Sequence, residues 1–157
     1  MNSDFTRILV VLVGAGILAA CQPSPQGPAD YVTNAAEIVN KADWSKMQTI
    51  TVEMDEHNYH PRDLTLKVGQ PYRIILKNTG EKEHYYTAPE FFKAIATRKA
   101  QVNKVAEFKA PYFTAIEVYK NGQAELFFVP VKRGTYPVIC TIDDHREKGM
   151  EGKLIVE

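Results

Sequence analysis

The stretch TYPVICTIDDHREKGMEGKLIVE, residues 135–157, combines strand-like sequence at both ends with a charged loop in the middle. Both ends are rich in β-branched, aromatic and aliphatic residues, a composition that predicts β-strands. Cys140, His145 and Met150 follow one another along the loop at five-residue steps. The sequence therefore predicts that a cysteine, a histidine and a methionine lie on one loop, which is fixed by a strand at each end.

These three side chains are typical metal ligands. A thiolate, a neutral imidazole and a thioether are soft or borderline donors, which suit copper far better than calcium or magnesium. Two histidines and a cysteine in a trigonal set, with a weak axial methionine, form an electron-transfer copper site. The loop supplies three of these four groups. His84 is the candidate for the second histidine, because it closely follows the strand expected at 72–77 and a neighbouring strand could bring it to the loop.

The rest of the chain also predicts a β-rich domain. Further strands are expected at 49–54, 63–67, 72–77, 114–119 and 124–131, where apolar residues alternate with polar ones or run together. Turn signals separate these runs, among them GQP, NTGE and Asn121-Gly122. About seven short strands with frequent turns predict an all-β fold, a β-sandwich.

Two segments are expected to contain helix. Residues 30–46 predict an N-terminal helix, with Asp30 as its cap and an apolar face that includes Val39. Pro89 suits the first turn of a second, short helix, which continues into an irregular excursion across the sandwich at 93–111. That excursion is basic, and we interpret its charges as a solvated face rather than a docking site.

Two segments resemble cupredoxins of the plastocyanin and azurin type. LTLKVGQPYRIILKNTGEKEH, residues 64–84, resembles the strand-turn-strand that leads to the first copper-binding histidine of that family. GTYPVICTIDDHREKGMEGKLIVE, residues 134–157, resembles its closing segment, with an aromatic residue four positions before the cysteine and Gly-Met-x-Gly before the last strand. The C-x4-H-x4-M spacing is closest to rusticyanin-like members, and the resemblance covers about residues 48–157.

The resemblance implies a cupredoxin-like Greek-key β-sandwich with a short N-terminal helix and a partly helical insertion. It also implies one copper ion that alternates between Cu(I) and Cu(II), with His84, Cys140 and His145 as strong ligands and Met150 as the axial ligand. Tyr85 stands where many members carry Asn or Ser, which tie the two ligand loops together. Charged neighbours of His145 replace the usual apolar patch, so partner docking is expected to be polar and sensitive to salt.

These residues also admit other interpretations. A lone buried cysteine commonly acts as a small hydrophobe, but that role for Cys140 leaves His145 and Met150 unexplained. A binuclear copper centre would need a second cysteine near Cys140. His57 and His60 lie in a turn-like region, and we interpret them as surface or turn residues rather than an auxiliary metal site. Two further residues, Trp44 and Met54, are interpreted as core.

The beginning of the chain reads as a targeting segment. Residues 1–20 carry an arginine before an apolar run that ends in small residues, which is typical of a secretory signal peptide rather than a spanning helix. The motif LAAC, ending at Cys21, resembles the lipobox of bacterial lipoproteins, in which the cysteine becomes lipid-modified. The alternative is an uncleaved anchor in which Cys21 is incidental.

The expected organisation is a lipoprotein signal peptide (1–20), a proline-rich tether with lipidated Cys21 (21–29) and a cupredoxin domain (30–157). The expected location is the bacterial cell envelope, with a lipid anchor on the periplasmic side of a membrane. Gln22, which follows the cysteine, favours the outer membrane.

The expected function is one-electron transfer at the periplasmic face of a membrane, in a respiratory chain, with a cytochrome or an oxidase as redox partner. Because Lys+Arg and Asp+Glu both total 19, the balanced charge argues against nucleic acid as a partner. No catalytic constellation is apparent, so neither an enzyme nor a small-molecule substrate is expected. The alternatives are a copper chaperone or storage protein, and an accessory subunit that docks on a respiratory complex through Lys93, Arg98 and Lys99.

Overall fold

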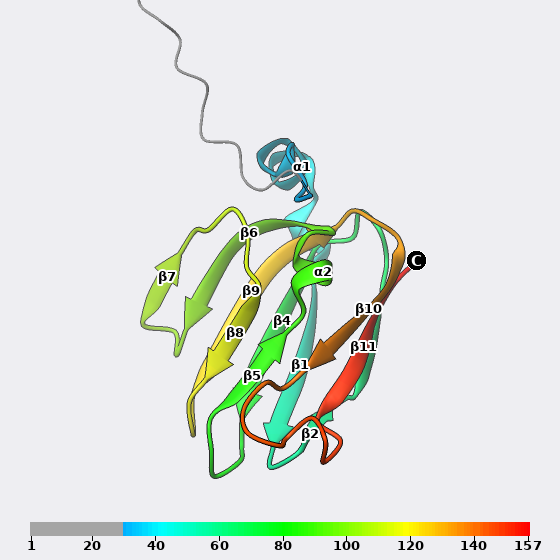
Figure 1. Ribbon diagram of the computed structural model, residues 1–157. Coiled ribbons are helices and arrows are strands. Elements are labelled where there is room, and N and C mark those ends of the chain that lie inside the picture. The colour runs from blue at the N-terminus through cyan, green and yellow to red at the C-terminus, as the bar shows by residue number, and fades with distance from the viewer. Residues whose placement is uncertain (1–29) are drawn as a thin grey trace, which may run out of the picture.

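The chain forms two β-sheets that pack face to face, and the computed structural model describes residues 30–157 (Figure 1). The expected signal peptide (1–20) and the tether with Cys21 (21–29) lie outside the described residues. The predicted all-β sandwich is confirmed.

Each sheet collects strands from distant parts of the chain. The six-stranded sheet has the order β2-β1-β4-β9-β6-β7, and the five-stranded sheet has the order β3-β11-β10-β5-β8. The strands of the first sheet are β1 (Gln48–Asp55), β2 (Asn58–His60), β4 (Tyr72–Asn78), β6 (Ile95–Val102), β7 (Ala106–Phe108) and β9 (Gln123–Pro130). Those of the second are β3 (Asp63–Leu66), β5 (His84–Thr87), β8 (Ala115–Val118), β10 (Gly134–Ile139) and β11 (Glu151–Val156).

The core lies between the two sheets. Val52, Leu76 and Phe128 of the six-stranded sheet and Leu154 of the five-stranded sheet each expose no more than 1% of their surface. Along β4 and β11, buried residues alternate with less buried ones, because successive side chains of a strand point to opposite faces. The seven strands that the sequence predicts, counting those at 135–140 and 153–157 on either side of the charged loop, are all present, with ends displaced by no more than two residues.

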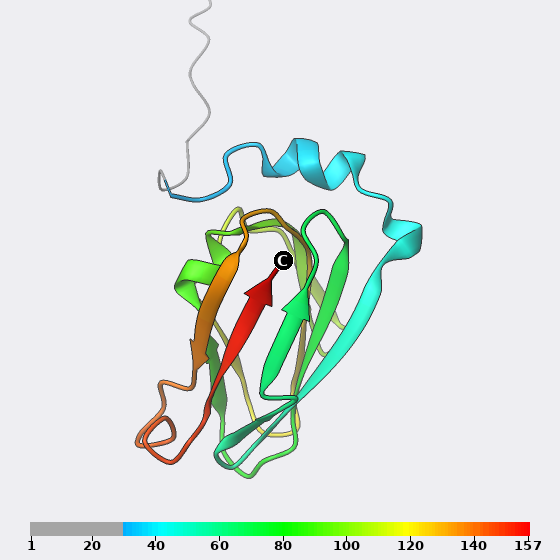
Figure 2. The same cartoon turned by 90° about the vertical axis from the view of Figure 1, so that its right-hand side faces the viewer.

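The N-terminal helix is much shorter than predicted. The segment 30–46 contains helix α1 (Ala35–Lys41) and a separate 3-10 turn at Trp44–Lys46, and the cap of α1 is Asn34 rather than Asp30. The β-branched Val32 and Thr33 disfavour helix before this cap. No residue of α1 is fully buried. The helix lies across one end of the sandwich, opposite the segment that joins β10 to β11 (Figure 2).

The two other residues interpreted as core differ from each other. Met54 has no exposed surface, as expected. Trp44 is only half-buried, and the guanidinium of Arg98 lies 4.3 Å from the centre of its ring. The Trp44 side chain therefore belongs to the periphery, where the indole N–H donates to the carbonyl of Val39.

The largest difference from prediction concerns the segment 93–111. After the predicted short helix, α2 (Pro89–Phe92), the chain enters β6, which pairs with β9 from Ile95 to Val102 and makes the excursion part of the six-stranded sheet. A bulge between Thr97 and Lys99 shifts the register of this pairing. The bulge interrupts the period-two pattern, so the sequence of β6 does not read as a strand.

Two other strands lie in segments whose sequence indicates a turn or loop. They are β2 in the segment HNYHP and β5, which begins at His84. With three and four residues, these strands are too short to show a clear alternation. Tyr59 in β2 is nevertheless buried, and its hydroxyl donates to the carbonyl of Tyr85 in β5.

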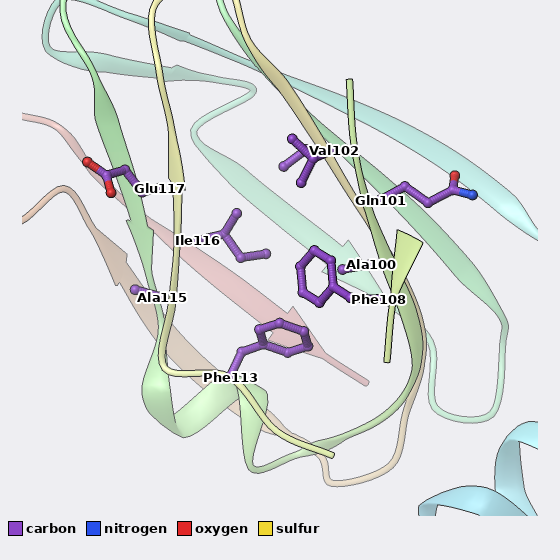
Figure 3. Close-up of a pocket in the computed structure, with 9 residues that line it drawn as sticks. Ala100, Gln101, Val102, Phe108, Phe113, Ala115, Ile116 and Glu117 are labelled. Carbon is purple, nitrogen blue, oxygen red and sulfur yellow. The ribbon is translucent and has the colours of Figure 1, made fainter. Parts of the chain in front are cut away.

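An apolar cavity of about 290 Å³ lies between β6 and β7 of one sheet and β8 of the other (Figure 3). Phe108, Phe113 and Ile116 are among the residues that line it. None of the four candidate copper ligands lines this cavity. Among residues 30–157, no helix is long and apolar enough to span a membrane.

Candidate metal centre

The strands bring His84, Cys140 and His145 to one end of the sandwich. His84 is the first residue of β5, and Cys140 directly follows β10. These two strands are antiparallel neighbours, with Thr87 opposite Ile139. Continuing this pairing past the end of β10 brings Cys140 alongside the beginning of β5, where the Tyr85 N–H donates to Cys140 Sγ at 3.4 Å. His145 lies on the loop that begins at Cys140.

The donor atoms of these three residues form a compact cluster. One donor atom from each of His84, Cys140 and His145 lies within 4.8 Å of the others. Cys140 Sγ is 3.6 Å from His145 Nδ1, and the two imidazole rings have their centres 5.1 Å apart. All three residues are buried, with exposed fractions of 0%, 1% and 2% respectively. The cluster is therefore largely closed to solvent.

Met150 closes the same loop. Its backbone N–H donates to the His145 carbonyl at 2.9 Å, and its carbonyl accepts the Cys140 N–H at 3.0 Å. Met150 has no exposed surface. The two bonds fold the loop back on itself, so that the residues at its beginning, middle and end come together just before β11.

The donor set fits copper. Among residues 30–157, His84 Nδ1 and Nε2 are the buried side-chain nitrogen or oxygen atoms that have no hydrogen-bond partner. A buried polar atom without a partner destabilises the fold, and a metal ion at the cluster would satisfy one of these nitrogens. Two imidazoles and a thiol beside a buried methionine are the groups that a mononuclear copper site requires.

The two ligand-bearing segments are tied together without the Asn or Ser side chain of many cupredoxins. Tyr85 occupies that position, and its backbone N–H makes the bond to Cys140 Sγ. The hydroxyls of Thr87 and Thr141 lie 3.2 Å apart and form a second link. Bonds of this kind orient metal ligands. The two segments are therefore linked even though Tyr85 replaces the usual Asn or Ser.

Burial favours the neutral form of both histidines. The pKa of His84 is lowered from its ordinary value of 6.5, first by burial and then by the nearby His145. The pKa of His145 is lowered by burial and by His57 and Lys82, against the opposing effect of Asp143 and Asp144. Neutral imidazole is the form that binds a metal.

These shifts predict that the metal-free protein is less stable in mild acid. The unfolded chain takes up protons below pH 6.5, the ordinary histidine pKa, whereas the folded chain does not until the pH reaches the lowered values. Above pH 6.5 the two histidines are neutral in both states and do not affect stability. As the pH drops below 6.5, protonation of the unfolded chain lowers the free energy of unfolding. We expect urea denaturation of the metal-free protein to give a lower free energy of unfolding at pH 5.5 than at pH 7.5. Equal values would contradict this account, and His60→Ala, at an exposed site, should retain the difference.

Two residues that the sequence analysis missed hold His84 in place. Asn78 is 2% exposed, and its side-chain amide donates to the carbonyls of Lys82 and Val118 while its oxygen accepts the Gly80 N–H. Gly80 lies against the His84 ring. The turn signal NTGE marked this segment, but its contacts with His84 depend on the folded turn.

Gly80→Ala is expected to displace His84. A methyl group on Gly80 would lie 2.8 Å from His84 Nε2 and 3.0 Å from the backbone nitrogen of Glu56, closer than carbon atoms normally approach. We expect the free energy of unfolding to fall by about 1–3 kcal/mol, measured by urea denaturation of the metal-free protein. The exposed neighbour Thr79 is the control, because Thr79→Ala should change stability by no more than about 0.5 kcal/mol. A fully stable Gly80→Ala protein would show that the ring tolerates the methyl group.

The two remaining histidines occupy different environments. His60 is exposed and its Nε2 lies 3.1 Å from the carboxylate of Asp55. His57 is in the turn between β1 and β2, as expected of a turn residue, but it is half-buried. Its ring centre lies 5.1 Å from that of His145, with the two rings nearly perpendicular. Sequence analysis missed this contact.

The basic residues of the segment 93–111 make contacts within the domain. Lys93 Nζ lies 2.8 Å from Glu90 and 3.5 Å from Asp30, and Lys99 Nζ lies 2.7 Å from Glu107. Arg98 stacks on Trp44. Because these three positive charges already have contacts within the domain, they are less available to a partner than the sequence alone implies.

Comparison with known proteins places this geometry in a family. A model of the cupredoxin-like domain family matches residues 31–156. The copper-resistant cuproprotein CopI of Rubrivivax gelatinosus is 24% identical over 110 residues, which are 69% of this chain and 66% of that protein. The chain thus spans slightly less than two thirds of the length of this relative.

A solved structure shares the fold at low sequence identity. A multi-copper oxidase from Pediococcus acidilactici is 16% identical, with a TM-score of 0.56 over 74% of this chain and 27% of the oxidase. Auracyanin A, a "blue" copper protein from Chloroflexus aurantiacus, is 21% identical, with a TM-score of 0.49 over 71% of this chain and 99% of auracyanin A.

Proposed function

This chain belongs to the cupredoxin-like domain family, and on that premise we propose that it is a one-electron carrier with a single copper ion. His84, Cys140 and His145 would be the strong ligands and Met150 the axial ligand. When bound, copper would supply a couple between Cu(I) and Cu(II) that takes up or gives away one electron.

The closed cluster of two histidines and a cysteine is the observation that carries this proposal. The donor atoms lie within 4.8 Å of one another before any metal is present, so the ligands need little rearrangement. The backbone bonds of Met150 and the Tyr85 bond to Cys140 hold the loop between β10 and β11. A site that keeps its shape in both oxidation states spends little energy on reorganisation. Its burial also leaves no open position for a substrate, which supports a carrier rather than an enzyme.

Spectroscopy and voltammetry of the copper-loaded protein test the proposal. We expect a stoichiometry of one copper per chain, an intense thiolate-to-copper band in the visible spectrum and a reversible one-electron wave. Stoichiometric binding without that band would favour copper handling over electron transfer. Failure to bind copper would return Cys140 to the role of a buried core residue.

The proposed partner is a cytochrome or an oxidase of a respiratory chain, which would dock at the metal end of the sandwich. His145 is 2% exposed and would be the ligand nearest to such a partner. Asp143, Asp144 and Lys148, all exposed on the same loop, support docking through charges. Electron transfer to such a partner should therefore slow as the salt concentration rises.

The proposed location is the periplasmic side of a bacterial envelope membrane, the outer membrane by preference, with a lipid on Cys21. The lipobox pattern in the sequence supports this location. The arrangement of the domain is compatible with it, because α1 and the β10–β11 loop lie at opposite ends of the sandwich (Figure 1). A lipid at the N-terminal end would leave the metal end free to meet a partner. Cys21→Ser should release the protein from the membrane fraction of the cells that make it.

Copper handling is the second candidate function. The relative from Rubrivivax gelatinosus is described as a copper-resistant cuproprotein, which favours a role in copper resistance, as a chaperone or a store. The two functions differ in what they require of the loaded protein. A carrier keeps its copper through many redox cycles, whereas a chaperone or store has to release it to an acceptor. Transfer of copper to a competing chelator within minutes would favour the second function.

A further inference from the structure

The candidate ligands are all buried, so incoming copper has to pass a residue at the surface first. Met150 and His84 have no exposed surface, and Cys140 and His145 expose only 1% and 2%. His57 is the histidine that packs beside this cluster and still reaches solvent. It is therefore a partly exposed imidazole in contact with the ligand His145.

The environment of His57 leaves its imidazole available to a metal. Among residues 30–157, no hydrogen bond or ion pair is made by the His57 side chain, whereas His60 nearby is engaged with Asp55. A neutral imidazole is a good ligand for copper in both oxidation states. The ring centres of His57 and His145 lie 5.1 Å apart in an edge-to-face arrangement, so the two imidazoles are immediate neighbours.

Charges at this end of the sandwich favour the approach of a cation. Glu56 is exposed beside His57 on the same turn, and Asp143 and Asp144 are exposed on the loop that carries His145. Lys82 lies 3.5 Å from Asp143, and Lys148 lies 2.9 Å from Asp144, so these pairs are locally neutral. Glu56 accepts the Glu81 N–H and forms no ion pair within the described part of the chain, residues 30–157, so it adds a negative charge next to the imidazole.

We propose that His57 is the uptake ligand of this protein, the first side chain to bind incoming copper, which then passes to His145. This proposal rests on the copper site put forward above. No change of oxidation state is involved: one imidazole replaces another as ligand, and the metal moves inward. His57 is not one of the final ligands, so the loaded protein should keep its thiolate-to-copper band when His57 is replaced.

The test measures how fast the full-length metal-free protein takes up Cu(II) in a stopped-flow instrument, through the growth of the thiolate-to-copper band. His57→Ala and His57→Phe are the variants, and His60→Ala is the matched control. Phenylalanine keeps a flat ring over His145 but cannot bind a metal. We expect both His57 variants to slow uptake by about tenfold, in line with the effect of groups next to metal ligands, while the control stays at the wild-type rate.

A second measurement separates loss of a ligand from a change in access. The reaction of the Cys140 thiol with a disulfide reagent in the metal-free protein reports access to the site without any metal, with Cys21→Ser as the background to remove the other thiol. We expect His57→Ala to react at least as fast as the protein with His57. Slow copper uptake together with undiminished thiol access is the result that the uptake role requires.

The outcomes distinguish the two proposals. Faster copper uptake in His57→Ala would mean that His57 only covers the site, and unchanged uptake would mean that it has no role; either result overturns the inference. If the protein with His57 intact binds no copper at its cysteine, the proposed function fails instead.

Discussion

Cys140→Ser is expected to abolish the intense visible band of the copper-loaded protein. The band arises from charge transfer between a thiolate and copper, and a serine hydroxyl, which stays protonated at neutral pH, cannot replace the thiolate. The loss of a strong ligand should also weaken copper binding by more than about a hundredfold, the upper end of the range for groups that only support a ligand. Visible absorption and a competition titration with a copper chelator measure the two effects.

The control for this experiment is the other cysteine of the chain. The chain has two cysteines, and Cys21→Ser, which changes the one outside the candidate site, should leave the band unchanged. Cys140 is 1% exposed, so a serine there buries a hydroxyl and is expected to lower the free energy of unfolding by about 1–3 kcal/mol. Far-UV circular dichroism shows whether the variant folds. A folded Cys140→Ser protein that keeps the intense band would rule out Cys140 as the ligand.

Asn78→Ala, a change outside the ligand set, is expected to cause a large loss of stability. The Asn78 side chain makes three hydrogen bonds of 2.7–2.9 Å, which join the end of β4 to the turn before His84 and to Val118 at the end of β8. Alanine would leave the buried Val118 carbonyl and the partly buried Lys82 carbonyl without this donor, and the Gly80 N–H would lose this acceptor. At about 1–3 kcal/mol for each unsatisfied group, we expect the free energy of unfolding to fall by roughly 3 kcal/mol or more.

The same change should disturb the metal centre, because the turn that Asn78 holds leads directly into His84. We expect weaker copper binding and a shifted visible band in Asn78→Ala. Asn58, whose amide lies at the surface and makes one long bond of 3.3 Å to Asp55, is the matched control. Asn58→Ala should alter stability by no more than about 0.5 kcal/mol. If the two variants are equally stable, the network around Asn78 is not what holds the turn.

The strands that the sequence predicts correctly have a clear local signal. In β4 and β11, apolar β-branched, aliphatic or aromatic residues gather within six or seven positions, and buried residues alternate with less buried ones because one face of each strand meets the core. The turns between them carry glycine, proline or asparagine, which mark strand ends. The fold class follows from repetition of this signal, since several short strands separated by turns can bury their apolar faces only against another sheet.

The strands that the sequence does not predict lack this clear local signal, and β6 is the main example. The bulge between Thr97 and Lys99 shifts the alternation within β6, and the basic side chains of this segment look like a solvated surface. Lys99, however, is largely buried along its stem, with its ammonium group 4.7 Å from the ring of Phe127. A long cationic side chain can cover apolar surface in this way, and sequence patterns read such a residue as exposed. The place of β6 beside β9 is a long-range contact that local periodicity does not contain.

The sequence by itself determined which donor atoms are available and in which order, because a cysteine, a histidine and a methionine on a loop between two strands are local facts. The sequence also indicated His84 as a ligand, because a strand is predicted before this residue and because residues 64–84 resemble the corresponding cupredoxin segment. Only the tertiary structure decided that the three donors converge within 4.8 Å, that Asn78 and Gly80 hold His84, and that His57 lies against His145. These features depend on the register between strands that are distant in the chain, so a residue and its neighbours along the sequence do not encode them.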